Sequence, residues 1–228
     1  DPDTYEAIIT VEYEDAPAVG ELVIEKKGEV LDAYKGGLFA DSEDKEFVYK
    51  EGSLAGAKFE IYAAEDIYTA DMQTDENGNR NKYYAEGDLV ATVVTGEDGK
   101  AKVSDLPLGK YRVVEAEAPY GYVLNKEEQY VTFVYVDDKT PVIKESLTFA
   151  NDRQKVDLSV AKLDGETGLP VSGAEFGLYA AEDIVNVDGK VIVEKDTLLE
   201  VAVSDANGDI QFVKDYPLGH YYAKEIKA

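Results

Sequence analysis

Two segments of this chain recur later in the same order, and this internal duplication limits the fold more than any other feature of the sequence. The segment GAKFEIYAAEDI at residues 56–67 recurs as GAEFGLYAAEDI at residues 173–184, 117 residues further on. The segment LPLGKYRVVE at residues 106–115 recurs as YPLGHYYAKE at residues 216–225, 110 residues further on. This pattern predicts two copies of one domain that differ in loop length.

Each copy is expected to consist of short strands and tight turns. Residues 89–94, 110–115 and 130–136 alternate apolar and polar side chains or are rich in β-branched and aromatic residues. Asn-Gly, Asp-Gly and Pro-Tyr-Gly sequences separate such segments and are typical of turns. No long amphipathic helix is apparent. We therefore predict an all-β chain in which each copy is a β-sandwich of about 100 residues.

The spacing between last and first strands predicts how the copies are divided. Lys162 lies eleven residues after Asn151, which ends a strand-like segment, and Lys26 lies eleven residues after Asp15. The chain is therefore interpreted as residues 1–15, the last strand of a preceding copy; residues 19–152, a complete copy; and residues 153–228, a copy without its last strand. The short connections between copies predict a semi-rigid rod.

Residues 28–52 have no counterpart in the later copy. Lys26 lies 30 residues before Gly56, whereas Lys162 lies 11 residues before Gly173, so the insertion amounts to 19 residues. We expect it to be a surface elaboration and the one distinctive place for a ligand-binding site. Neither end carries a recognisable secretory leader or anchor motif, so we expect a piece of a longer protein.

Composition argues against several kinds of function. There are 48 acidic and 23 basic side chains, and this net charge of −25 disfavours binding to nucleic acid and to anionic membranes. The absence of cysteine excludes disulfides and thiol chemistry, and a single histidine, His220, excludes multi-histidine metal sites. Residues 75–81 weakly resemble a calcium loop, but Arg80 stands where such a loop needs glycine, so a β-turn is preferred. No metal or cofactor is expected.

Three polar side chains are predicted to point into one apolar core. Lys26, Glu115 and Asn151 each follow two apolar residues on the same strand face, because residues two apart share a face. The apolar residues on those faces are Leu22 and Ile24, Tyr111 and Val113, and Leu147 and Phe149. Each polar group would be costly to bury without a partner. The alternatives are an exposed strand end for Lys26, a solvent-facing Glu115 and a turn cap at Asn151.

The strings VDLSVAKLDGETGLPVSGAEFGLYA, LPLGKYRVVEAEAPYGY and LTFAND resemble the Cna B-type repeats and SpaA-type pilin domains of Gram-positive surface proteins, over nearly the whole chain. The resemblance implies tandem Ig-like, prealbumin-like sandwiches arranged as a rod. It also implies an isopeptide crosslink between Lys26 and Asn151, with Glu115 as the proton relay. Lys162 and Glu225 match the same lysine and glutamate in the next copy, and Asp15 matches the acceptor of the preceding one.

The implied chemistry is a single self-modification and not enzymatic turnover. Burial disfavours the charged forms of an amine and a carboxyl group. A neutral lysine can then attack the asparagine carbonyl, while the acid donates to the developing oxyanion and relays protons to the departing ammonia. Folding supplies the proximity that this reaction needs.

The resemblance further implies a stalk or adhesin segment of a secreted protein displayed on a Gram-positive cell wall, with neighbouring repeats as partners. Two alternatives stay open: a module that binds host matrix or glycan, and an accessory sandwich of a secreted hydrolase. Residues 4–15 of one molecule are also expected to be able to complete the open copy of the next, with a Lys162–Asp15 link. No membrane insertion is expected, and the usual pilin lysine motif is not apparent.

Overall fold

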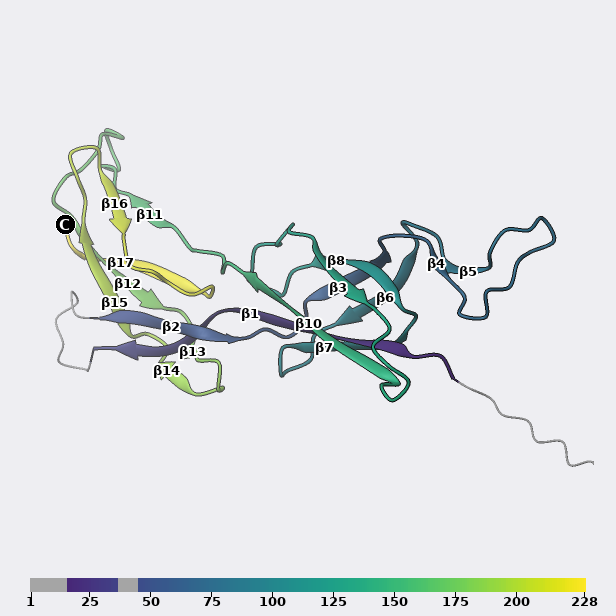
Figure 1. The fold of residues 1–228 in the computed structure, drawn as a ribbon. Coiled ribbons are helices and arrows are strands. Elements are labelled where there is room, and N and C mark those ends of the chain that lie inside the picture. Colours follow the sequence, from purple (N-terminus) through teal and green to yellow (C-terminus); the bar gives the residue numbers. More distant parts are fainter. Residues whose placement is uncertain (1–15, 37–44) are drawn as a thin grey trace, which may run out of the picture.

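The computed structural model describes residues 16–36 and 45–228 as an elongated molecule (Figure 1). Regular structure in these residues consists of strands alone, which confirms the predicted all-β fold class. No helix among them is long and apolar enough to cross a membrane. Two β-sandwiches lie end to end (Figure 1). Asp15 and the strand predicted at residues 4–15 lie outside the described residues.

One sheet of the first sandwich has β1 (Val19–Lys35) at its centre, between β10 (Val142–Asn151) and β7 (Lys100–Leu106). β1 runs parallel to β10 and antiparallel to β7. Its side chains alternate between buried and more exposed positions as far as Val30. This alternation is typical of a strand with one face on a core, and it places Lys26 on the buried face.

The facing sheet has the order β6 (Leu89–Val94), β3 (Lys58–Ala63), β8 (Gly109–Glu117) and β9 (Gln129–Phe133), all antiparallel. The largest apolar side chains buried between the two sheets are Leu22, Ile24, Phe59, Ile61, Tyr111, Phe133 and Phe149. A small extension made of β4 (Ile67–Tyr68) and β5 (Lys82–Tyr84) projects from this sandwich (Figure 1). In the loop of this extension, Asp75 accepts backbone hydrogen bonds from Asn77 and Asn79, as in an Asx turn.

The second sandwich repeats this arrangement with fewer strands. β11 (Leu158–Ala161) pairs with β16 (Asp209–Phe212), and the facing sheet has the order β15 (Leu198–Val203), β12 (Glu175–Ala180), β17 (Tyr221–Lys227). β13 (Ile184–Val185) and β14 (Val191–Val193) form the counterpart of the β4–β5 extension. Among the described residues, β11 and β17 each pair with one strand, whereas their counterparts β1 and β8 are paired on both edges.

Equivalent hydrogen bonds confirm the alignment of the two sandwiches at two turns. The Tyr111 hydroxyl donates to the Pro107 carbonyl at 2.6 Å, and the Tyr221 hydroxyl donates to the Pro217 carbonyl at 2.7 Å. In the same way, the backbone N–H of Lys26 donates to Gly99 at 2.7 Å, and that of Lys162 donates to Gly208 at 2.8 Å. The two sandwiches can therefore be compared residue by residue.

The prediction that residues 28–52 form a surface elaboration is wrong. The second half of β1 pairs with β2 (Glu46–Ser53) in an antiparallel hairpin that leaves the first sandwich and lies along the second (Figure 1). Phe47 on β2 is only 7% exposed and belongs to the core of the second sandwich, with its ring centroid 6.1 Å from that of Tyr216. The half-buried side chains packed against the same core from this hairpin are Leu31, Tyr34 and Tyr49.

Hydrogen bonds also join the hairpin to the second sandwich. The backbone N–H of Val187 donates to the Leu31 carbonyl at 2.9 Å, and the Asn186 side chain donates to the Asp32 carbonyl at 2.9 Å. The Tyr49 hydroxyl donates to the Asp215 carbonyl at 3.2 Å. The apolar face of the hairpin is therefore covered and not free for a ligand. The sequence alone contained no information on which distant part of the chain covers this face.

Arg153 joins the parts that meet at the junction between the sandwiches. Its guanidinium carbon lies 3.8 Å from the ring centroid of Tyr49, which is a stacking distance. The same guanidinium forms ion pairs with Asp215 on the second sandwich and with Glu29 on β1. One side chain on the connection thus contacts both the hairpin and the second sandwich, which restrains their relative orientation.

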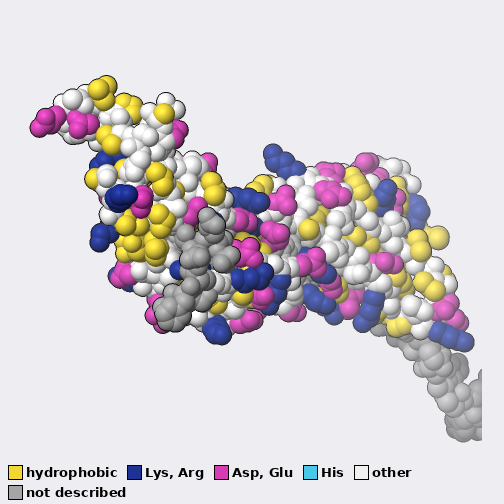
Figure 2. Space-filling view, turned by 90° about the vertical axis from the view of Figure 1, so that its left-hand side faces the viewer, with side chains coloured by type: hydrophobic (Ala, Val, Ile, Leu, Met, Phe, Trp, Pro, Cys, Tyr) yellow, Lys and Arg dark blue, Asp and Glu magenta, His cyan; other side chains and the backbone are white. Residues whose placement is uncertain are grey.

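On the face shown in Figure 2, Lys and Arg side chains are dispersed among Asp and Glu side chains, and acidic residues outnumber basic ones in the sequence. On the first sheet, Lys100 pairs with Glu25 at 2.8 Å and Lys102 pairs with Glu21 at 2.5 Å. In each pair the lysine is exposed and the glutamate is partly buried. Surface pairs contribute little to stability, roughly 0–1 kcal/mol each. Their arrangement reduces local repulsion in a chain with a large negative net charge.

Candidate functional site

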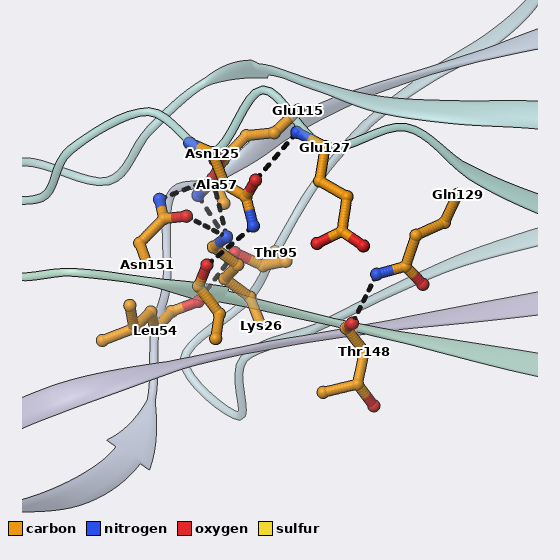
Figure 3. Close-up of polar contacts among 11 residues, drawn as sticks. Lys26, Leu54, Ala57, Thr95, Glu115, Asn125, Glu127, Gln129, Thr148 and Asn151 are labelled. Atoms are coloured by element: carbon orange, nitrogen blue, oxygen red, sulfur yellow. Dashed lines mark hydrogen bonds and ion pairs between the residues drawn. The ribbon is translucent and has the colours of Figure 1, made fainter.

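Lys26, Glu115 and Asn151 meet inside the first sandwich (Figure 3). Their exposed fractions are 1%, 5% and 5%. Lys26 Nζ lies 2.5 Å from Asn151 Oδ1 and 3.0 Å from Glu115 Oε1. Asn151 Nδ2 donates to the same carboxylate oxygen at 2.9 Å. One oxygen of Glu115 therefore contacts both the amine and the carboxamide nitrogen.

Strand register explains why these side chains converge. Phe149 lies directly opposite Lys26, so Asn151 is the next residue along β10 on the same face. Gly28 is the partner of Asn151 in this register, and a Cβ atom there would lie 2.8 Å from the backbone oxygen of Asn151. The missing side chain at Gly28 therefore lets the end of β10 approach β1 closely. Glu115 comes from β8 on the facing sheet.

Two aromatic rings lie near the amine. Lys26 Nζ lies 5.7 Å from the ring centroid of Phe59 and 5.8 Å from that of Phe149, and the two centroids are 4.8 Å apart. Burial among these groups lowers the pKa of Lys26, and this effect outweighs the opposing influence of Glu115. The site therefore favours the neutral amine, which is the nucleophilic form, more than water does.

Asn125 is a residue of this site that the sequence did not reveal. Its backbone N–H donates to Glu115 Oε2 at 2.8 Å, and its side chain donates to the Ala150 carbonyl at 2.9 Å (Figure 3). Both oxygens of Glu115 are thus held in place. Since the first of these contacts uses a backbone amide, which every residue except proline has, residue type carried no signal for it.

A small hollow lies beside Asn151. It is lined by residues 123–126 and 150–152, which lie on the chain before β9 and at the end of β10. Asn151 itself contributes to the lining, so the hollow adjoins the buried site.

The structure also brings together the equivalent pair in the second sandwich. Lys162 Nζ lies 2.9 Å from Glu225 Oε2, but the side chains are 26% and 33% exposed. Glu225 Oε1 is buried and has no hydrogen-bond partner among the described residues. In the first sandwich the corresponding carboxylate has partners on both oxygens. The second site therefore has the lysine and the glutamate in contact and one acceptor atom unused.

The chain is built from modular β-sandwich repeats. One of them buries a lysine, a glutamate and an asparagine together. The family model SpaA, described as a prealbumin-like fold domain, matches residues 45–147 and 156–228. The chain belongs to this family. This confirms the resemblance to SpaA-type domains and the prealbumin-like fold that it implied.

Individual relatives are similar over part of their length. The trypsin-resistant surface T6 protein of Streptococcus pyogenes serotype M6 is 28% identical over 123 residues, which are 53% of this chain and 21% of that protein. The structure of the Bacillus anthracis TIE protein has a TM-score of 0.53 and 28% identity, and it covers 92% of this chain and 28% of that one. The structure of the shaft pilin SpaA from Lactobacillus rhamnosus GG has a TM-score of 0.35 and 15% identity, and the match covers 92% of this chain and 89% of that one. The chain therefore spans less than a third of the length of the T6 protein and of the TIE protein.

Proposed function

We propose that this chain is a stalk segment of a protein displayed on a Gram-positive cell wall, and that an isopeptide bond between Lys26 and Asn151 closes its first sandwich. The observation that supports the bond most directly is the contact of Lys26 Nζ with the Asn151 carboxamide, with Glu115 beside both groups. The surface location is supported by membership of the SpaA family and by similarity to a streptococcal surface protein.

The reaction is an amide exchange. A proton passes from Lys26 Nζ to the Glu115 carboxylate, and the resulting amine attacks Cγ of Asn151. Glu115 then donates to the developing oxyanion and relays protons from the attacking nitrogen to Nδ2. The bond from Cγ to Nδ2 breaks, Nδ2 leaves as ammonia, and the carboxyl group keeps one proton. No external reactant is consumed.

The position of the bond suits a segment that carries tension. Lys26 lies in the strand that begins the sandwich, and Asn151 ends the strand that leads into the connection to the second one. A force that enters before β1 and leaves after β10 therefore passes through the crosslink. The 124 residues between the two then cannot be pulled out to their full length by that force unless a covalent bond breaks.

The intact mass of the folded protein tests the proposal. We expect a mass lower than that of the sequence by one ammonia molecule, and a branched peptide that contains Lys26 and Asn151 after digestion. A folded protein with the full sequence mass would overturn the proposed bond.

Glu115→Gln is expected to slow bond formation by a factor of about 10²–10⁴, because a carboxamide cannot relay protons. The measurement is the fraction of crosslinked protein, followed by intact mass after purification. Glu117→Gln is the matched control, since Glu117 lies on the same strand but pairs with Lys58 at the surface. An unchanged rate in Glu115→Gln would remove Glu115 from the mechanism.

The slow Glu115→Gln protein also allows a pH test. Burial lowers the pKa of Lys26, and loss of the Glu115 charge removes the main influence that raises it. The amine reacts only when deprotonated, so the rate should rise with pH and level off above a midpoint that lies below the ordinary lysine value of 10.5. A midpoint at or above that value would contradict a buried nucleophile.

We also propose that the second sandwich accepts a strand that carries an asparagine or aspartate at the free edge of β11. Support comes from the contact of Lys162 with Glu225 and from the unused oxygen of Glu225. Residues 4–15 of another molecule, with Asp15 as the acceptor, are the candidate donor. Size-exclusion chromatography should then show head-to-tail oligomers at high concentration, and a monomer at all concentrations would count against this association.

A further inference from the structure

A groove open to solvent lies on the first sandwich. The strand ends that line it lie at the end of this sandwich that is remote from the second one (Figure 1). Three segments line it, namely residues 16–19 at the start of β1, residues 68–70 at the end of β4, and the turn from β7 to β8 with Asp105, Pro107 and Leu108. The side chains that complete the lining are Met72, Arg80, Tyr83 and Tyr135. Its volume is about 520 Å³.

The same three segments of the second sandwich are covered by the β1–β2 hairpin. Thr69 corresponds to Asn186 and Asp105 corresponds to Asp215 in the alignment of the two sandwiches. In the second sandwich, Asn186 donates to the Asp32 carbonyl of the hairpin, and Asp215 accepts from its Tyr49 hydroxyl. The connection before β11 also takes part, because Arg153 stacks on Tyr49.

The lining of the groove is apolar enough to favour a partner. Met72 is 74% exposed, and the aromatic side chains of Tyr68, Tyr83 and Tyr135 are also exposed. The Arg80 guanidinium carbon lies 4.6 Å from the ring centroid of Tyr68, so the groove presents a cationic group beside an aromatic ring. Apolar groups that converge in one groove gain free energy when a matching surface covers them.

We propose that this groove receives a β-hairpin equivalent to residues 28–52, supplied by the repeat that precedes this one in the array. The proposal rests on the proposed stalk function. The hairpin of this chain cannot be the occupant, because β1 carries it away from the groove and it covers the second sandwich instead. Each junction would then consist of a short connection and an interlocking hairpin, which makes successive repeats into one continuous rod.

A three-sandwich protein tests the proposal. Residues 1–151 are fused directly to residues 16–228, so that Asn151 takes the position of Asp15 and the leading hairpin faces the groove. Cysteines replace Asp32 of the leading copy and Thr69 of the following copy, and a short bismaleimide is the probe. The sequence has no cysteine of its own, so a crosslink can form only between the introduced pair.

The matched control is the 228-residue chain with Asp32→Cys and Asn186→Cys, because at the existing junction the Asn186 side chain donates to the Asp32 backbone carbonyl and the two residues are therefore close. We expect both proteins to crosslink, and we expect Phe47→Ala in the leading copy to abolish the crosslink to residue 69. Crosslinking in the control without crosslinking at residue 69 would overturn the proposal. The isopeptide bond is read separately from the intact mass of the same samples, so failure of the bond and failure of hairpin docking are distinguishable.

Discussion

Replacement of Lys26 by alanine should lower the free energy of unfolding of the first sandwich by about 5 kcal/mol. The proposed crosslink joins residues 125 positions apart. In the chain-entropy description, a crosslink that closes a loop of that length stabilises the fold by about 5 kcal/mol, and the variant lacks it. The variant should also have the mass of its full sequence. Unfolding in guanidinium chloride can be followed by tyrosine fluorescence, because the chain has 17 tyrosines and no tryptophan.

Lys27→Ala is the control for this experiment. Lys27 is the next residue on β1, but it points outward and pairs with Glu51 at 3.5 Å at the surface. Its loss should change stability by less than about 1 kcal/mol and leave the intact mass one ammonia below the sequence mass. The unreacted form of Glu115→Gln should be destabilised nearly as much as Lys26→Ala, since it lacks the same bond. Equal stability of the Lys26 and Lys27 variants would contradict the crosslink.

Phe47→Ala should destabilise the second sandwich by about 3–5 kcal/mol, although Phe47 precedes that sandwich by more than 100 residues in the sequence. The ring is buried against Tyr216 in the core of the second sandwich, so its removal leaves a cavity there. Hydrogen exchange should show the loss of protection in β12 and β15. The isopeptide bond should still form, because Lys26, Glu115 and Asn151 do not contact Phe47.

Tyr120→Ala is a suitable control for this second prediction, since the side chain is 94% exposed. It should leave exchange in both sandwiches nearly unchanged. Loss of protection confined to the first sandwich in Phe47→Ala would contradict the assignment of the hairpin to the second core. An effect as small as that of Tyr120→Ala would show that the hairpin does not contribute to stability.

The three residues of the site were predictable to different degrees. Period-two alternation places Lys26, Glu115 and Asn151 on apolar strand faces, but each alternative with an exposed side chain has the same local pattern. The family resemblance supplied the pairing of the three. Asn125 was not predictable, since its contact with Glu115 depends on the path of the chain between β8 and β9 and not on its side-chain type.

The sequence alone was sufficient for features that repeat or alternate locally. Duplicated segments, turn residues and strand periodicity are short-range properties, so they determined the β fold, the repeat and the faces on which polar residues lie. Only the tertiary structure decided that Leu31, Tyr34, Phe47 and Tyr49 pack in the core of the second sandwich. Burial of their apolar side chains is favourable against any complementary apolar surface, because the hydrophobic effect is non-directional. Which surface lies close enough to cover them is set by the folded chain and not by the local sequence.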